Sequence, residues 1–265
     1  MQKVTTKTLS DMKKKGERIA VLTAYDFMLA SILDEIGIDI VLVGDSSGMV
    51  FSGYDTTLPV TMDEMLLHVK AVRRGVKRAM LVADMPFMSF QESEEKALYN
   101  AARFMKEGNT EAIKIEGGRR VAPLVDKMVG YGIPVMGHIG LTPQSIHIFG
   151  DWSVRGKTED ARNELLEDAK SLEEAGVFTI VLEKIPSSLA REITKRLKIP
   201  TIGIGAGPYC DGQVLVTYDM LGMFEKFRPK FVRVYAEIGS QIKKACSRYL
   251  DDVKSGRFPQ EKESF

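Results

Sequence analysis

Eight short apolar segments, rich in β-branched residues, recur along the chain, and each is followed by a turn and then by a helical pattern. Their apolar character is continuous rather than alternating, which is typical of strands buried on both faces of a parallel sheet. We therefore expect a parallel sheet covered by helices. The predicted strands are residues 19–23, 39–43, 79–83, 112–115, 133–137, 178–182, 201–204 and 214–217.

Helix start and stop signals occupy the segments between these strands. Thr61 and Glu64 have the spacing of a capping box, and Gly75 ends the apolar periodicity that follows. Ser89 and Glu92 repeat the capping spacing before the next helical pattern. Eight strand–helix units in 265 residues leave about 33 residues per unit, which matches the ~250 residues of a (β/α)8 barrel.

A doubly wound open sheet is the competing architecture. We favour the (β/α)8 barrel because polar residues follow the strands in one consistent series, as an active site at the carboxyl ends of barrel strands requires. No linker rich in Pro, Gly or Ser divides the chain. We therefore expect residues 1–265 to form a single barrel domain with short polar N- and C-terminal extensions, including the charged residues 13–18 and 255–265.

The charge balance excludes several classes of protein. Lys and Arg number 37 and Asp and Glu 36, and both signs are spread along the chain, whereas a nucleic-acid binder concentrates positive charge.

No apolar run approaches the ~18 residues that a membrane span needs, so we expect no membrane partner. The two cysteines, Cys210 and Cys246, are too few for a disulfide framework, which favours a cytoplasmic protein.

Acidic side chains follow three consecutive predicted strands: Asp45, Asp84 and Glu116. Each alone is compatible with a turn, a cap or a solvated loop. Because neighbouring strands of a parallel barrel converge at one mouth, the three carboxylates should lie close together. Such a cluster usually shares a proton or binds a hard cation, and an all-oxygen ligand set suits Mg²⁺. The sequence therefore predicts a Mg²⁺ site.

Three further strand-end residues carry useful chemistry. Lys114 lies two residues before Glu116, so both side chains point to the inward face, where the lysine either binds an acidic substrate or neutralises Glu116. His138 follows the fifth strand and is either a core imidazole or a substrate contact. Glu183 follows the sixth strand.

Two loops are open to more than one interpretation. The glycine-rich residues 203–207 have the composition of a phosphate-binding loop, but their spacing is not the dinucleotide fingerprint, and close packing explains them equally well. Residues 144–157, which contain glycines and the single Trp152, are our candidate for a lid over the site.

Ordered motifs extend over nearly the whole chain. They include VLVGDSSGM at residues 41–49, VADMPFM at 82–88, IKIEGG at 113–118, GHIGLTPQS at 137–145 and VLEKIP at 181–186. The chain thereby resembles the ketopantoate hydroxymethyltransferase family. The resemblance implies a TIM barrel of the phosphoenolpyruvate/pyruvate kind and a homodecamer of two pentameric rings.

The implied reaction transfers a hydroxymethyl group from 5,10-methylenetetrahydrofolate to 3-methyl-2-oxobutanoate. The product is 2-dehydropantoate, an intermediate of pantothenate and coenzyme A biosynthesis. Carried over residue by residue, the resemblance implies that Asp45 and Asp84 are Mg²⁺ ligands and also contact the oxoacid. Glu116 belongs to the same metal site, close to the ion directly or through water.

The resemblance also implies roles for the remaining polar residues. Ser46 and Lys114 would contact the oxoacid, and Glu183 would be the general base that removes a proton from the substrate. The chemistry of this reaction, rather than the resemblance, leads us to expect that His138 hydrogen-bonds an oxygen of the substrate or intermediate. The chain departs from the family pattern locally, with Ser47 where leucine is usual and Lys184 where cysteine is frequent.

Two other function classes remain open from the residues alone. A Mg²⁺-dependent carbon–carbon lyase or mutase of the isocitrate lyase type would use the same carboxylate cluster, although the Lys-Lys-Cys-Gly-His loop of those lyases is absent from the sequence. A noncatalytic barrel that binds a metabolite is the third class. Its weakness is that an unoccupied acidic mouth costs stability.

Overall fold

Eight parallel strands form a closed barrel in the computed structural model, which describes residues 2–223 and 229–265. The strands pair in chain order, and β8 pairs with β1 to close the ring. The predicted parallel barrel is therefore confirmed. Its strands are β1 Ile19–Thr23, β2 Ile40–Val43, β3 Met80–Asp84, β4 Ala112–Glu116, β5 Val135–Gly140, β6 Thr179–Glu183, β7 Thr201–Ile204 and β8 Gly212–Leu215.

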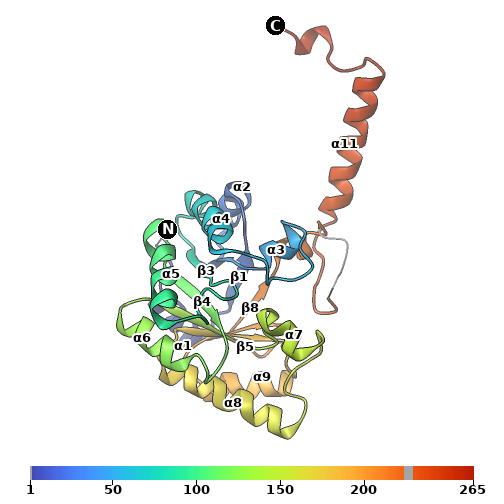
Figure 1. The fold of residues 1–265 in the computed structure, drawn as a ribbon. Coiled ribbons are helices and arrows are strands. Elements are labelled where there is room, and N and C mark those ends of the chain that lie inside the picture. The colour runs from blue at the N-terminus through green and yellow to red at the C-terminus, as the bar shows by residue number, and fades with distance from the viewer. Residues whose placement is uncertain (1, 224–228) are drawn as a thin grey trace. The chain divides into compact units, whose positions relative to one another are not determined.

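Helices follow the strands and surround the barrel (Figure 1). Those between β1 and β8 are α2 Phe27–Glu35, α3 Ser47–Val50, α4 Met62–Gly75, α5 Glu94–Glu107, α6 Ala122–Gly130, η1 Pro143–Ser145, α7 Ile146–Phe149, α8 Glu159–Glu174 and α9 Ser187–Arg196. Before β1 comes α1 Thr6–Lys15, and after β8 come α10 Thr217–Met220, α11 Ile238–Lys254 and η2 Glu261–Glu263.

One of the two predicted capping boxes is present. Thr61 caps α4, its side chain accepting from the backbone N–H of Glu64 while the Glu64 carboxylate accepts from the Thr61 N–H. The second prediction is wrong, because α5 begins after Ser93, whose hydroxyl accepts from the Lys96 N–H. Ser89 is instead buried in the preceding loop, where its N–H donates to the carbonyl of Pro86.

Strand β8 begins and ends two residues earlier than predicted. Gly212 is its first residue and pairs with Ile19 of β1. A Cβ atom at Gly212 would lie 2.4 Å from the Ile19 carbonyl oxygen, so only glycine permits this close approach. Thr217, which the sequence placed in the strand, begins α10 instead. A glycine at a strand start weakens the apolar pattern from which the strand was predicted.

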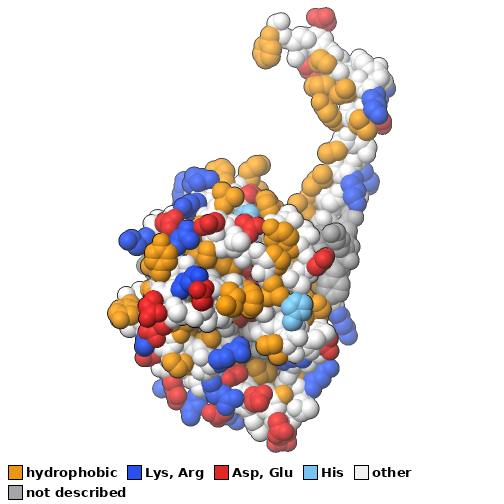
Figure 2. Space-filling view, viewed as in Figure 1, with side chains coloured by type: hydrophobic (Ala, Val, Ile, Leu, Met, Phe, Trp, Pro, Cys, Tyr) orange, Lys and Arg blue, Asp and Glu red, His pale blue; other side chains and the backbone are white. Residues whose placement is uncertain are grey.

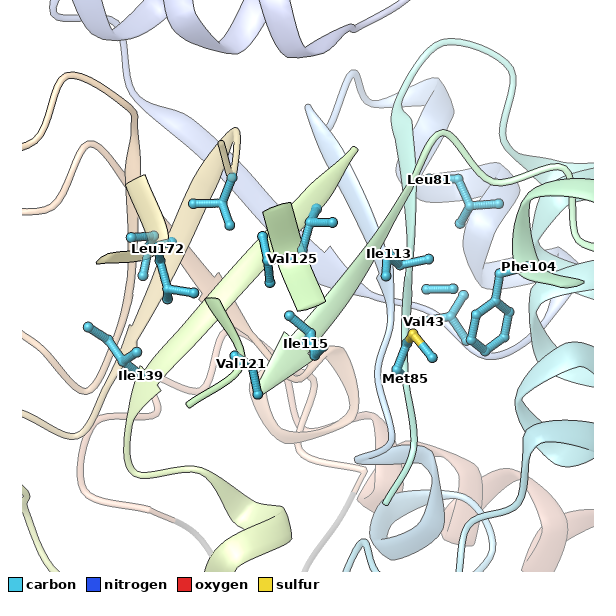
Figure 3. Packing of buried hydrophobic residues seen from close by; sticks show 14 of the residues in the cluster. Val43, Leu81, Met85, Phe104, Ile113, Ile115, Val121, Val125, Ile139 and Leu172 are labelled. Atoms are coloured by element: carbon cyan, nitrogen blue, oxygen red, sulfur yellow. The ribbon is translucent and has the colours of Figure 1, made fainter. Parts of the chain in front are cut away.

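The barrel unit contains two separate sets of buried apolar side chains. Side chains alternate along each strand, so Ile40 and Leu42 point into the barrel while Val41 and Val43 point out toward the helices. The outer set also holds Leu81, Met85, Phe104, Ile113, Ile115, Val121, Val125, Ile139 and Leu172, which Figure 3 shows between strands and helices. The inner set also holds Val21, Met80, Val82, Ala112, Met136, Val181, Ile202 and Val214.

The inward-facing series changes from apolar to polar toward the carboxyl ends of the strands. Because side chains repeat their direction every second residue, the polar residue two positions after an inner apolar one also points inward. The apolar residues fill the interior, and the polar residues lie at one end of it. On β3, β4, β5 and β6, the inner apolar residue and the polar residue two positions after it are Val82 and Asp84, Ala112 and Lys114, Met136 and His138, and Val181 and Glu183.

The N-terminal segment belongs to the opposite end of the barrel. Leu9 of α1 is fully buried and joins the inner apolar set, together with Val4. Lys13 forms an ion pair with Asp211, with 2.8 Å between Nζ and Oδ2, and the same carboxylate oxygen accepts from the Thr201 N–H. The segment is thus a helix that packs against the barrel, while residues 14–18 are exposed.

Two compact units make up the described chain. The first ends at Leu215 and contains the whole barrel, and the second spans Val216–Phe265. Within the second unit, the Tyr235 and Ile238 N–H groups donate to carbonyls of Met220 and Leu221, which ties the start of α11 to the end of α10. A single domain over residues 1–265 stays a prediction.

The surface agrees with the balanced charge of the sequence. On the face shown in Figure 2, Lys and Arg side chains are interspersed with Asp and Glu. On this face neither sign of charge forms a continuous patch among the described residues. Among the described residues, no helix is both long enough and apolar enough to cross a membrane.

Candidate active site

Strand register places the polar side chains beside one another at the carboxyl end of the barrel. Asp84, the last residue of β3, is paired with Lys114 of β4. Glu116, the last residue of β4, is paired with His138 of β5. Glu183 ends β6, the next strand. Paired residues of neighbouring parallel strands point to the same face, so these five side chains share the barrel mouth.

Lys114 forms the central ion pair of this cluster. Its Nζ lies 2.7 and 2.8 Å from the two carboxylate oxygens of Asp84, and 3.7 Å from Oε1 of Glu116. Burial alone would lower the pKa of Lys114, but the carboxylates of Asp84, Glu116 and Asp45 outweigh burial and raise it above its ordinary value. Lys114 therefore carries a fixed positive charge inside the barrel.

Asp45 follows β2 and completes the acidic group. Its backbone N–H lies 3.4 Å from Oδ2 of Asp84, and its own Oδ2 accepts from Nε2 of Gln144 at 3.0 Å. Burial raises the pKa of Asp45 well above its ordinary value, and the negative charges of Asp84 and Glu116 raise it further. Without a compensating positive charge, this carboxyl therefore tends to hold a proton.

Ser46 lies beside Asp45 and is half-buried. Its Oγ is 2.9 Å from the hydroxyl of Tyr25, a fully buried residue on the loop between β1 and α2. The carbonyl of Tyr25 is in turn 2.8 Å from Nδ1 of buried His68 on α4. Two buried residues, Tyr25 and His68, thus fix the position of the Ser46 hydroxyl.

His138 lies between two carboxylates. Its Nδ1 is 3.3 Å from Oε1 of Glu116, and its Nε2 is 3.3 Å from Oε2 of Glu183. Burial lowers the pKa of His138 and Lys114 lowers it further, but the two carboxylates outweigh both effects and raise it to about 9. The imidazole is therefore positively charged at neutral pH. Neither nitrogen is aligned for a hydrogen bond to any described residue.

Glu116 faces His138 on one side and a backbone donor on the other. Its Oε2 accepts from the Gln144 N–H at 3.1 Å, while its buried Oε1 has no aligned hydrogen-bond donor among the described residues. Burial alone would raise the pKa of Glu116, but His138 and Lys114 lower it below the ordinary value. Glu183 is the most accessible carboxylate of the cluster, with 15% of its side chain exposed against 4% for Glu116.

The structure thus brings all seven predicted site residues to one end of the barrel, and it adds one that the sequence analysis missed. Gln144 lies in η1, is 6% exposed, and donates from Nε2 to Asp45 Oδ2 and to the Met85 carbonyl. Its position in a single turn after β5 gives no periodic signal. The one sequence feature that could have identified Gln144 is its place after a strand end. The sequence analysis assigned that segment only to a lid.

The charges of the cluster fit a divalent cation. Four carboxyl groups (Asp45, Asp84, Glu116 and Glu183) face two positive side chains, Lys114 and the charged His138, so the cluster keeps a net negative charge even when Asp45 holds a proton. Among the described residues, no three His, Cys, Asp or Glu side chains converge as a complete ligand set. Mg²⁺ needs only one or two carboxylates and keeps several waters, so this donor set suits it.

Two neighbouring loops were singled out in the sequence. In residues 203–207, a Cβ at Gly207 would lie 2.5 Å from Cβ of Ser187, so close packing explains this glycine. In the predicted lid, the Arg155 N–H donates to the Lys184 carbonyl at 2.8 Å, and the Lys184 ammonium donates to the Trp152 carbonyl. The lid segment is thereby attached to the residue after Glu183. A phosphate site and a closing motion stay predictions.

The chain matches known proteins over its full length. A family model described as ketopantoate hydroxymethyltransferase matches residues 3–261. A relative named 3-methyl-2-oxobutanoate hydroxymethyltransferase from Caldicellulosiruptor saccharolyticus is 56% identical over 265 residues and is covered, like this chain, to 100%. A relative of the same name from Syntrophus aciditrophicus is 55% identical, over 100% of this chain and 97% of its own.

Solved structures show the same fold at low sequence identity. Phosphonopyruvate hydrolase in complex with oxalate and Mg²⁺ has a TM-score of 0.62 and 13% identity, covering 98% of this chain and 93% of its own. 2,3-Dimethylmalate lyase, a member of the PEP mutase/isocitrate lyase superfamily, has a TM-score of 0.62 and 14% identity, covering 98% and 91%. At these identities the likeness concerns the fold alone.

Proposed function

The chain belongs to the ketopantoate hydroxymethyltransferase family, and we propose that it transfers a hydroxymethyl group from 5,10-methylenetetrahydrofolate to 3-methyl-2-oxobutanoate. The products are 2-dehydropantoate and tetrahydrofolate, and water supplies the oxygen of the new hydroxyl group. The observation that carries the proposal is the inward series of Asp84, Lys114, Glu116, His138 and Glu183 at one end of the barrel. It combines a buried cation, an acidic group for a metal ion and an accessible carboxylate.

Lys114 and Ser46 are suited to bind the carboxylate end of the oxoacid. Lys114 has three N–H donors, and the two Asp84 oxygens at 2.7 and 2.8 Å account for two of them. Ser46 is half-buried and held by Tyr25, so its hydroxyl has a defined position beside Asp45. The charge of Lys114 favours an anion, and the Ser46 hydroxyl can donate a hydrogen bond to one of its oxygens.

Asp45 and Asp84 would hold Mg²⁺, with Glu116 reaching it through water. Oε2 of Glu116 accepts from the Gln144 N–H, while its Oε1 has no aligned donor among the described residues and would face the ion or a water bound to it. When bound, Mg²⁺ supplies stabilisation of the negative charge that develops on the keto oxygen of the substrate. Burial beside Asp84 and Glu116 raises the pKa of Asp45, so a bound cation would take the place of a proton at this carboxyl.

Glu183 is our candidate for the general base. His138 is positively charged below about pH 9, so it cannot accept the substrate proton at neutral pH. Its Nε2 lies 3.3 Å from Oε2 of Glu183, and its positive charge attracts that carboxylate. Glu183 would take the proton from the carbon next to the keto group, and that carbon would then form its new bond to the methylene carbon of the folate. Both C–N bonds of the methylene carbon would break, water would supply its hydroxyl group, and the two folate nitrogens would take up the protons released by substrate and water. His138 would also stabilise a substrate oxygen.

Proton NMR of 3-methyl-2-oxobutanoate in D₂O tests this function in two stages. With purified protein, we expect loss of the C–H signal only when Mg²⁺ is present, and formation of 2-dehydropantoate once 5,10-methylenetetrahydrofolate is added. Exchange without product would retain the base and metal roles but reject the folate as one-carbon donor. No exchange at all would reject the proposal. Dicarboxylate substrates of the lyase class would then be assayed, since the shared fold alone does not establish that activity.

We further propose the assembly and location that the family resemblance implies. The chain would form a homodecamer of two pentameric rings in the cytoplasm. With 29.5 kDa per chain, ten copies amount to 295 kDa. Sedimentation equilibrium would distinguish this mass from that of a single pentamer or a monomer.

A further inference from the structure

We propose that Gln144 is a positioning residue that orients the Asp45 carboxylate for cation binding. The inference rests on the proposed function, since it takes Asp45 as a cation ligand. Gln144 would touch neither substrate nor ion and would act through Asp45.

Every polar group of the Gln144 side chain has a partner. Its Nε2 donates to Oδ2 of Asp45 at 3.0 Å and to the carbonyl of Met85 at 2.9 Å, and its Oε1 accepts from Nε2 of Gln91 at 3.3 Å. With both amide protons and the oxygen engaged, the side chain has one orientation. Since Gln144 is 6% exposed, water competes little for these bonds.

The backbone of Gln144 fixes a second member of the acidic group. Its N–H donates to Oε2 of Glu116 at 3.1 Å. One residue in η1 after β5 therefore joins groups that follow β2 and β3 and a side chain at the end of β4. Pro143, which precedes it as the first residue of η1, restricts the backbone at this turn. Through Gln144 the spacing between Asp45 and Glu116 depends on a rigid turn rather than on their own loops.

The chemistry of an amide suits this role. A neutral N–H donor orients a carboxylate without adding positive charge, so the attraction of the site for a cation is kept. A lysine or arginine at position 144 would orient Asp45 equally well but would cancel that attraction. Partners of this kind around a metal site usually change metal affinity by about 10-fold to 100-fold when they are removed.

Mn²⁺ binding, followed by EPR of the free ion, tests the inference without any substrate. Gln144→Met keeps the length of the side chain but removes both N–H donors, and we expect about 10-fold to 100-fold weaker Mn²⁺ binding than in the unaltered protein. Gln91→Met is the matched control, because it removes the partner of Gln144 Oε1, and an acceptor of the Phe90 N–H, but leaves both N–H donors of Gln144 in place. We expect its Mn²⁺ affinity to stay within about threefold of the unaltered protein.

Gln144→Asn covers the case in which Gln144→Met fails to fold. Its amide is one methylene shorter and cannot reach Asp45 and Met85 together, so Mn²⁺ binding should again weaken by about 10-fold. Urea unfolding of each variant separates this effect from general loss of stability, because a purely structural glutamine would change the unfolding midpoint and leave the affinity of the folded protein unchanged.

Three results would overturn the inference. The first is Mn²⁺ affinity in folded Gln144→Met or Gln144→Asn within about twofold of the unaltered protein. The second is an equal loss of affinity in Gln91→Met. The third is absence of Mn²⁺ binding in the unaltered protein, which would also refute the metal role in the proposed function. The first two results leave the proposed function intact, so the two failures are distinguishable.

Discussion

Replacing Lys114 by methionine is expected to destabilise the metal-free protein by about 3–5 kcal/mol at pH 7. Lys114 makes two hydrogen bonds to Asp84, at 2.7 and 2.8 Å, and each bond to a charged group contributes about 1.5–3 kcal/mol. Methionine fills a similar volume, so the cost comes from the charge. The substitution leaves the buried carboxylate of Asp84 without its ion-pair partner, and it leaves Glu116 with His138 as a remaining positive neighbour.

The cost of Lys114→Met should depend on pH in one direction. Burial raises the pKa of Asp84, and Lys114 opposes that rise, so the pKa increases further once the lysine is gone. A carboxyl whose folded pKa lies above its unfolded value contributes stability that is present below the unfolded pKa and lost as pH rises through the folded pKa. The folded-state pKa of Lys114 is itself raised, so its own contribution is constant below pH 10. The difference between variant and parent therefore grows from pH 4 to pH 7.

Urea unfolding in EDTA at a series of pH values measures this difference. Lys170→Met is the matched control: its side chain is 63% exposed, with Nζ 3.9 Å from Glu174, and it should change stability by less than about 0.5 kcal/mol. Adding Asp84→Asn to Lys114→Met should recover part of the loss, because one unpaired charge is then absent. A loss below about 1 kcal/mol, or an equal loss at pH 4 and pH 7, would refute the electrostatic reasoning.

Three further predictions follow from the same geometry. Glu183→Gln should slow C–H exchange of 3-methyl-2-oxobutanoate by about 10²-fold to 10⁴-fold with little change in KM, and near-normal exchange in the NMR assay would remove Glu183 from the base role. The folded-state pKa of His138 is about 9, above the ordinary value of 6.5. Its charged imidazole should therefore contribute roughly 3 kcal/mol of stability, which is complete below about pH 6.5 and lost as pH rises through 9. Urea unfolding of His138→Gln should lack this decline, and an equal decline in both proteins would contradict a charged imidazole. Gly212→Ala places a Cβ 2.4 Å from the Ile19 carbonyl and should lower stability by about 2 kcal/mol or more in thermal melts. Gly130→Ala, with no atom within 4 Å, should be neutral or stabilising by up to about 1 kcal/mol, and equal melting shifts for the two glycines would argue against a tight β1–β8 contact.

The order and direction of the strands could be predicted from the sequence because burial on both faces leaves a local pattern. A run such as Ile40–Val43 is apolar throughout, since Ile40 faces the barrel interior while Val41 faces the helices. The start of β8 could not be predicted in this way. Gly212 has no side chain to contribute to the pattern, and its place in the strand depends on contact with β1, far away in the sequence.

The members of the candidate site were predictable for a related reason, and their mutual contacts were not. Alternation along β4 is enough to place Lys114 and Glu116 on one face. The carboxylate that forms an ion pair with Lys114 is determined by the register between β3 and β4, which aligns Lys114 with Asp84. A single strand does not contain this information. Gln144 was missed because its role comes entirely from partners on other elements, although the chain motif around it was noted. The roles of all these residues stay predictions.

The barrel can hold an electrostatically unfavourable cluster at one end because the apolar side chains that stabilise the fold fill the other end. The lower interior is filled by apolar side chains such as Met80 and Val181 and is closed by Leu9 of α1. The upper interior holds a buried excess of negative charge in which the pKa of Asp45 is raised by burial and by like charges. Such a cluster costs folding free energy, and a cation that returns this energy on binding is held more tightly for the same reason. In the proposed function, the repulsion among these carboxyl groups would therefore contribute to the affinity for the cation.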